Sequence, residues 1–438
     1  MAYIINAMAQ RHLKRNFSLG VLNGAFFDLF CALLEPSLVL SWFVSQLTTS
    51  NFLIGLILPI QNGGWFLPQL VISSYLQRRQ RKLPFYTYMA GVRVAMWGLM
   101  TLAVFLVEDA AVLLIVFFIL LTAYSLADGL AGISFVDIVA KAIPPTRRGA
   151  FFGWRRFLGG ILALGGSLLV KYILDERHDL AFPDNYAVLF LLSFFILCVA
   201  LACFIMTVEP LEPVNGERVP LGKQFRRAWD LPRRDRNYRR FLTMRLLLMA
   251  AEVATPFYIV YAKHALSVSV SMVGVYLTGT TLASFASNLL WGRISDRRGN
   301  KLLIALSNSL GLFIPLTALS IVPLAELWPG LREFAPGLFA LVFVLSGSAK
   351  SGVMIGNINF LLEIAPADDR SIYIGFTNTI IGIALLASSV GGLIVDLVGF
   401  TVLFSLALAL YALALLLTLS LQEPRLITSK TQRHEVIL

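Results

Sequence analysis

The sequence is poor in charged residues, which make up 14% of its 438 residues, while hydrophobic residues make up 58%. A soluble globular domain has about 25% charged and roughly 45–50% apolar residues. The mean hydropathy of the chain is correspondingly high, at +0.77. This balance excludes a soluble globular fold. Because the apolar residues come in runs of about 20, it predicts membrane-spanning helices.

Cysteine and histidine are also scarce. The three cysteines, Cys31, Cys198 and Cys203, lie in apolar runs without the spacing of metal ligands, which favours small core residues over a metal site. We therefore expect neither a metal nor a cofactor. The four histidines fall at the ends of the apolar runs or between them, so a buried histidine relay for protons is not expected.

Several catalytic and nucleotide-binding motifs are missing. The sequence has no His-Glu-x-x-His, no Gly-x-x-x-x-Gly-Lys loop, and no serine, histidine and aspartate that can be placed together. A pump driven directly by ATP is therefore not supported, and we do not expect an enzyme. A polytopic membrane enzyme remains as an alternative class.

Twelve apolar segments are long enough to cross a bilayer, and each should be helical because backbone polar groups in lipid have to be satisfied within the segment. The prediction is an all-α integral membrane protein. Pro36, Pro59, Pro68, Pro256 and Pro315 fall inside these spans and are candidate kinks. The predicted spans are 18–46, 51–76, 84–107, 110–140, 150–174, 185–208, 239–265, 270–292, 301–322, 337–363, 371–396 and 400–421.

The distribution of lysine and arginine predicts the orientation. With both termini in the cytoplasm, 29 of the 36 basic residues lie in cytoplasmic segments and four lie in external loops. The positive-inside rule then predicts cytoplasmic termini in a cell's inner or plasma membrane. The same asymmetry accounts for the net charge of +11, so no nucleic-acid partner is expected.

A polar segment divides the chain into two halves of six spans. The expected parts are an N-terminal bundle (1–208), a cytoplasmic linker (209–238), a C-terminal bundle (239–421) and a cytoplasmic tail (422–438). A shift of 222 positions pairs proline, arginine, glycine and serine residues around spans five and eleven, which favours repeated halves over chance similarity between glycine-rich helices. Repeated halves are common in secondary transporters, with the substrate site between them.

The stretch from Gly292 to Lys301, Gly-Arg-Ile-Ser-Asp-Arg-Arg-Gly-Asn-Lys, resembles the Gly-x-x-x-Asp-Arg-x-Gly-Arg-Lys loop motif of the major facilitator superfamily. Six plus six spans and a long central loop are similar to that family. Its motif usually stands between spans two and three, where this chain keeps the basic residues of 74–82 but lacks the aspartate. The Gly-Pro antiporter signature of span five is also missing, so an antiporter is not indicated.

We interpret this charged segment, 291–301, as a turn that gates the cytoplasmic side. Gly299 permits a tight turn and Gly292 permits close backbone approach. Asp296 is suited to accept hydrogen bonds from a neighbouring helix start or to pair with an arginine. The alternative is a solvated loop whose basic residues only set topology. The candidate gating residues are Gly292, Arg293, Asp296, Arg297, Arg298 and Gly299.

Ionisable residues inside spans cost about 2.5–3.5 kcal/mol on insertion scales and mark transport pathways by default. The resemblance implies that spans one, four, seven and ten line a central cavity, and these four spans carry most such residues. The alternative is structural ion pairs, for example between Arg93 and an acid of span one. The candidate substrate or ion pathway residues are Asp28, Glu35, Asp128, Arg245, Glu252 and Lys350.

The predicted function is a monomeric secondary transporter in the lipid bilayer that moves a small organic solute by alternating access, with protons as the candidate coupling ion. Charged residues and amides such as Gln61 and Asn62 favour a polar or charged solute. Aromatic residues such as Phe27 and Trp65 fit an amphipathic compound equally well, so a lipid flippase or drug efflux protein is the main alternative.

Overall fold

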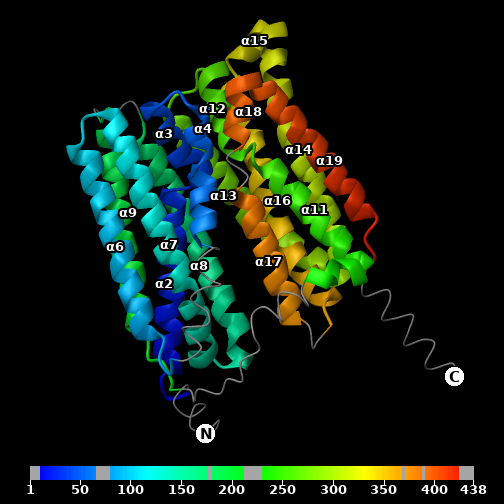
Figure 1. Ribbon diagram of the computed structural model, residues 1–438. Coiled ribbons are helices and arrows are strands. Elements are labelled where there is room, and N and C mark those ends of the chain that lie inside the picture. The colour runs from blue at the N-terminus through cyan, green and yellow to red at the C-terminus, as the bar shows by residue number, and fades with distance from the viewer. Residues whose placement is uncertain are drawn as a thin grey trace, which may run out of the picture. The chain divides into compact units, whose positions relative to one another are not determined.

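The structure is a computed structural model that describes residues 10–65, 79–175, 180–211, 229–366, 370–386 and 390–423 (Figure 1). Within these ranges the chain is helical and has no strand. By length and composition, nine helical segments of the described chain can cross a membrane. The predicted all-α membrane fold is therefore confirmed. Part of the second predicted span and the junction at 387–389 lie outside the described residues.

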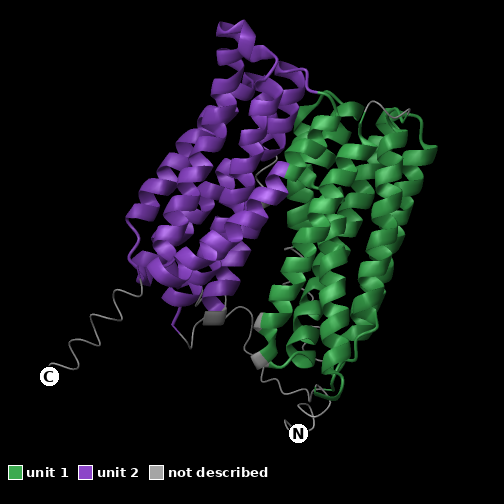
Figure 2. Ribbon diagram, turned by 180° about the vertical axis from the view of Figure 1, so that it is seen from behind, with its two compact units in different colours: residues 1–217, 269–278 green, residues 218–268, 279–438 purple. Residues whose placement is uncertain are grey.

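The chain divides into two compact units (Figure 2). Unit 1 comprises Met1–Glu217 with Ser269–Thr278, and unit 2 comprises Arg218–Val268 with Gly279–Leu438. The division passes through one long helix, α13 (Ser271–Arg298). Most of the predicted linker, 212–228, lies outside the described residues.

Unit 1 is built around α2, which packs against α8 and α9, and α6, which packs against α7 and α9. The residues at 57–65 are also helical. The bounds of its helices are α2 (Leu13–Leu33), η1 (Pro36–Leu40), α3 (Ser41–Leu47), α4 (Asn51–Gly55), α6 (Leu83–Leu106), α7 (Ala110–Ala142), α8 (Pro145–Ile173) and α9 (Asp184–Ile205).

Unit 2 repeats this pattern: α11 packs against α17 and α19, and α14 packs against α16 and α19. In the predicted order of spans, the pairs one–five, one–six, three–four and three–six of unit 1 recur six spans later. Besides α13, the helices are α11 (Arg236–Glu252), α12 (Thr255–Ala265), α14 (Asn300–Leu327), α15 (Pro329–Arg332), α16 (Ala335–Ile364), α17 (Arg370–Leu386), α18 (Val390–Val398) and α19 (Phe400–Leu419).

Two of the predicted proline kinks interrupt a helix. The first span breaks at Glu35, and Pro36 begins the π-helix η1. The seventh breaks between α11 and α12, where Pro256 is the second residue of the new helix and its missing N–H costs no hydrogen bond. Pro315 instead lies inside α14, and Pro59 lies inside the helical stretch 57–65. Pro68 is outside the described residues.

Large apolar side chains cover the outer faces of both units. Leu106, Leu289 and Leu397 expose 74%, 75% and 81% of their surface. In water such a surface would drive aggregation, whereas in a bilayer it faces lipid. Polar side chains are found in the interior instead, as with Asn308, which is fully buried and donates to the Thr418 hydroxyl (2.9 Å).

Candidate functional site

Arg93 on α6 is a buried cation within a predicted span. Its Nη2 atom pairs with Oδ1 of Asp128 on α7 at 2.8 Å. Its guanidinium also lies over the rings of Phe27 (5.2 Å) and Tyr124 (5.5 Å). The alternative of an ion pair between Arg93 and an acid of span one is therefore wrong, since the acid that pairs with Arg93 is on span four. The Arg93 side chain is 3% exposed and that of Asp128 is 24% exposed, so only the carboxylate reaches open space.

That space is a cavity of about 230 Å³ inside unit 1. It is bordered by α2, η1, the stretch 57–65, α6 and α7, because its lining residues come from these elements. The lining comprises five aromatic rings, three leucines, the amides of Gln61 and Asn62, the thiol of Cys31 and the carboxylate of Asp128. Of the predicted pathway residues, only Asp128 lines it.

Asp28 lies on α2 facing α8, where its Oδ1 atom is 3.6 Å from Arg156 Nη1. The neighbouring Arg155 donates to the Asn23 side chain (2.8 Å) and to the Gly20 carbonyl (3.1 Å). Both arginines lie on α8, within the predicted span 150–174. α8 begins earlier than that span, at Pro145, and proline is favoured at the first position of a helix.

The carboxylate of Glu35 finds its hydrogen-bond donors within its own turn. It accepts hydrogen bonds from the Leu38 backbone N–H (2.8 Å) and the Ser37 hydroxyl (2.7 and 2.8 Å). Such a side chain caps the exposed N–H groups at a helix start. The contacts give Glu35 a structural function at the break between α2 and η1, and it does not line the cavity of unit 1.

The other three predicted pathway residues lie in unit 2. Glu252 is the last residue of α11, Arg245 lies two turns earlier, and Lys350 lies on α16 with an exposed side chain. Within the described chain no ion pair closer than 4.0 Å joins these three residues, so their place in a pathway stays a prediction.

The charged segment 291–301 is mostly helix rather than the predicted turn, because α13 continues to Arg298. Gly299 alone separates α13 from α14, with φ at +88°, a conformation that glycine adopts without strain. Arg297 and Arg298 stand in the last turn of α13, where cations are favourable. Among the described residues no atom lies within 4 Å of a Cβ built on Gly292, so that glycine shows no close approach.

The charged side chains among the candidate gating residues are exposed: Arg293, Asp296, Arg297 and Arg298. Ser295 is buried and donates to the Asn300 side chain (2.7 Å). Glu423, from the segment after α19, accepts a hydrogen bond from the Lys301 backbone N–H (2.9 Å). At the start of α14 the carboxylate among the described residues is thus that of Glu423, which lies outside the motif at 292–301.

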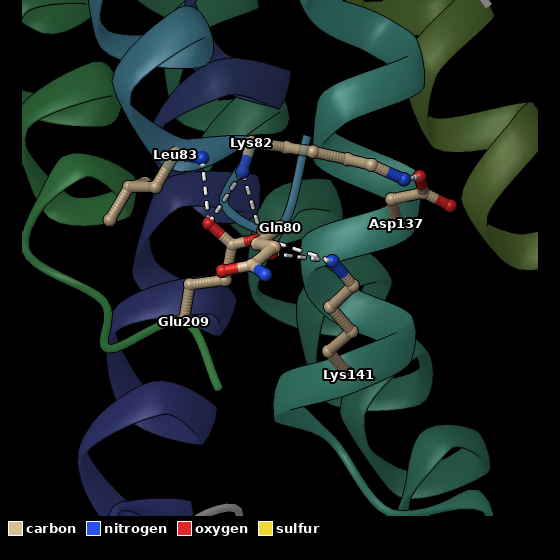
Figure 3. A network of polar contacts seen from close by, with 6 residues as sticks. All are labelled: Gln80, Lys82, Leu83, Asp137, Lys141 and Glu209. Carbon is tan, nitrogen blue, oxygen red and sulfur yellow. Dashed lines mark hydrogen bonds and ion pairs between the residues drawn. The ribbon is translucent and has the colours of Figure 1, made fainter. Parts of the chain in front are cut away.

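Unit 1 has a corresponding network at the start of α6 (Figure 3). Glu209, after α9, accepts hydrogen bonds from the backbone N–H groups of Lys82 and Leu83 (2.7–2.9 Å) and pairs with Lys141 (3.3 Å). The Lys82 side chain reaches the other way and pairs with Asp137. The first-half loop lacks the motif's aspartate, and Glu209 supplies a carboxylate there.

The sequence of the chain matches one family model and a few curated proteins. The family model described as Major Facilitator Superfamily matches residues 240–436. Uncharacterized proteins of Mycobacterium tuberculosis and Mycobacterium bovis are 22% identical over 271 residues, which is 60% of this chain and 50% of theirs. The match thus spans about half the length of these curated relatives.

Solved structures share the fold of more than nine tenths of the chain. A D-xylose–proton symporter matches with a TM-score of 0.69 and 16% identity, covering 94% of this chain and 99% of its own. A mutant of the nucleoside transporter NupG matches with a TM-score of 0.67 and 14% identity, covering 93% and 98%. A bacterial homologue of the iron transporter ferroportin, inward-facing, matches at 0.65 and 13%, covering 94% and 98%. At these identities the likeness concerns the fold alone.

Proposed function

The chain belongs to the major facilitator superfamily, and we propose that it is a secondary transporter that carries a small organic solute by alternating access. As a membrane transporter of this type it is an integral, multi-pass membrane protein. The proposal adds the kind of cargo, the mechanism and a candidate coupling ion, the proton. It further places both termini in the cytoplasm, as the excess of basic residues in the predicted cytoplasmic segments favours.

The observation that carries the proposal is the Arg93–Asp128 ion pair beside the cavity of unit 1. A buried charge pair is costly in a membrane and is weak evidence for stability by itself. It is usually retained where charges face a water-filled pathway. Asp128 meets this condition, because its carboxylate is the charged group among the described lining residues. An aspartate in a solute pathway is also suited to carry a proton.

The two halves would then move as bundles 1–208 and 239–421 about the linker 209–238, with 422–438 as a cytoplasmic tail. The recurrence of the same helix pairs in both units supports this division. Glu209 and Glu423, at the edges of the linker and the tail, bond to their own bundles and would move with them. In this proposal the gate includes Gly292, Arg293, Asp296, Arg297, Arg298 and Gly299.

The test is solute uptake into proteoliposomes that contain the purified full-length protein. Radiolabelled D-xylose, uridine and phenethylamine represent a sugar, a nucleoside and an amine, and each is measured with and without an inward proton gradient. We expect at least one organic solute to enter faster than in protein-free vesicles, and Asp128→Asn to abolish any acceleration by the gradient. Asp184→Asn, an exposed aspartate at the start of α9, is the matched control.

The outcomes separate the parts of the proposal. Equal accumulation with and without the gradient would remove proton coupling but leave transport intact. Solutes that bind the protein are found by the rise they cause in its midpoint of thermal unfolding. If none of these solutes enters faster than in protein-free vesicles, the transport proposal itself is overturned. Uptake of a fluorescent phospholipid instead would favour the flippase alternative.

A further inference from the structure

The cavity of unit 1 presents charge of one sign. Among the described residues that line it there is one carboxylate, Asp128, and no lysine, arginine or histidine. The positive partner of Asp128 lies behind the wall, since the Arg93 side chain is 3% exposed. Gln61 and Asn62 add amide groups, which both donate and accept hydrogen bonds. A solute in this cavity therefore meets a carboxylate and no cationic side chain among the described lining residues, which disfavours an anion.

The aromatic part of the lining is firmly positioned. Phe30, Trp97 and Tyr124 contact one another, with ring centroids 5.2–5.9 Å apart. The Trp97 indole N–H donates to the Ser193 hydroxyl (2.8 Å), which fixes the plane of that ring. Trp65 lines the cavity from the stretch 57–65 and is 38% exposed. Aromatic faces attract cations because the ring quadrupole is negative above the plane.

Part of the cavity lining already binds a cationic group of the protein itself, the guanidinium of Arg93. The Arg93 guanidinium lies over Phe27 and Tyr124 and pairs with Asp128, and all three of these partners also line the cavity. The combination of a carboxylate and aromatic faces is therefore suited to a cation on the cavity side as well. The volume of about 230 Å³ lies below the roughly 300–1,000 Å³ typical of sites for drug-sized ligands, so the ligand is small.

We propose that this cavity binds a small organic cation, an amine with one aromatic or aliphatic ring, whose ammonium group pairs with Asp128 and whose apolar part lies against Trp65 and Trp97. The inference rests on the transport function proposed above and names the substrate class for it. Cys31, which is exposed and lines the same cavity, provides a chemical probe of occupancy.

The test uses three probes of matched size: phenethylamine, which is protonated at pH 7, neutral 2-phenylethanol and anionic phenylacetate. Binding to the purified full-length protein in detergent is measured by calorimetry. Protection of Cys31 from N-ethylmaleimide is measured in a protein with Cys198→Ala and Cys203→Ala. We expect phenethylamine to bind about tenfold more tightly than 2-phenylethanol, which corresponds to one charge-assisted contact. It should protect Cys31, and phenylacetate should not.

Two variants locate the contacts. Asp128→Asn should remove the preference for phenethylamine over 2-phenylethanol. Trp65→Leu, which leaves the ion pair intact, should weaken both probes while keeping the preference, and it decides the question if Asp128→Asn does not fold. Asp184→Asn should bind all three probes as the wild type does. Equal binding of the alcohol or the anion, no binding at all, or binding without protection of Cys31 would each overturn the proposal.

The failure of this proposal is distinguishable from that of the transport function. If proteoliposomes move another solute while phenethylamine neither binds nor protects Cys31, the substrate class is wrong and transport stands. If phenethylamine protects Cys31 but no solute crosses the membrane, the cavity binds cations and the transport proposal is wrong.

Discussion

Glu209 of unit 1 and Glu423 of unit 2 make the same contact. Each carboxylate accepts from the backbone at the start of a helix: Glu209 from the N–H groups of Lys82 and Leu83 at α6 (2.7–2.9 Å), and Glu423 from the N–H of Lys301 at α14 (2.9 Å). Each follows the last helix of its unit and precedes a proline. A helix start carries unpaired N–H groups and a partial positive charge, so a carboxylate is stabilising there.

The residue before each glutamate is held by an asparagine from the first helix of the unit. Asn16 on α2 both donates to the Val208 carbonyl (2.9 Å) and accepts from its N–H (2.8 Å). Asn237 on α11 does the same with Gln422 (3.1 and 2.9 Å). The segment after α9 is thus bound to α2 and α6, and the segment after α19 is bound to α11 and α14 by the same kinds of contact. The shift of 222 positions that relates spans five and eleven does not align these residues.

The Glu209 contact predicts a loss of stability when its charge is removed. Glu209→Gln keeps one acceptor oxygen but loses the charge-assisted bonds to α6 and the pair with Lys141. Because Glu209 is buried, we expect a cost of about 1–3 kcal/mol, seen as a lower midpoint of thermal unfolding in detergent. Glu333→Gln, at an exposed position after α15, is the control and should unfold as the wild type does. An unchanged midpoint for Glu209→Gln would show that the cap contributes nothing.

The two glycines of the charged segment should differ sharply on substitution. Gly299 has φ at +88°, and a Cβ built on it would lie 2.5 Å from Glu423 Oε2, so Gly299→Ala should cost about 1–3 kcal/mol. Gly292 lies within α13 with open space around it, so Gly292→Ala should be neutral or slightly stabilising. Thermal unfolding of both variants checks this. Equal midpoints for the two would contradict the assignment of Gly299 as the turn.

The long helices are predictable because each contains an apolar run about as long as a bilayer is thick. The predicted span 84–107 is α6 (Leu83–Leu106), and 110–140 is α7 (Ala110–Ala142). The ends are less predictable where charges belong to the helix. α13 continues through Asp296 to Arg298, because helical geometry stops at the glycine rather than at the first charge.

The contacts between helices are not predictable in the same way. A membrane helix that is apolar all round has no stripe to show which face meets its neighbour. The sequence identified Asp128 as a pathway residue and Gln61 and Trp65 as polar and aromatic candidates, and all three line the cavity. It did not identify Tyr124 and Trp97, because their role follows from the rotation of α6 and α7 about their axes.

Asp296 provides a test of the gate that is independent of folding. The residue is exposed on the last turns of α13, so Asp296→Ala should leave membrane insertion and thermal unfolding unchanged. If it pairs with a group that is engaged in only one transport state, the variant should carry its solute more slowly at equal surface expression. The measurement is the initial rate of uptake per molecule at the surface. A rate equal to that of the wild type would remove the gating role and leave a solvated charge that sets topology.

The Arg93–Asp128 pair makes the strongest prediction about stability. Removing one partner leaves a buried charge without compensation, which typically costs about 3–5 kcal/mol. Because the Asp128 side chain is 24% exposed, we expect Arg93→Met to lie near the low end, at about 3 kcal/mol. The double variant Arg93→Met, Asp128→Asn removes both charges and should recover most of that loss.

Arg156→Met is the matched control for this comparison, because Arg156 also pairs with an aspartate, at 3.6 Å, but is 67% exposed. Exposed pairs contribute about 0–1 kcal/mol, so its midpoint of unfolding should barely change. The double variant separates stability from function. It should unfold close to the wild type yet bind phenethylamine no better than 2-phenylethanol, because the carboxylate is gone. A double variant as unstable as Arg93→Met would mean that the two residues do not act as a pair.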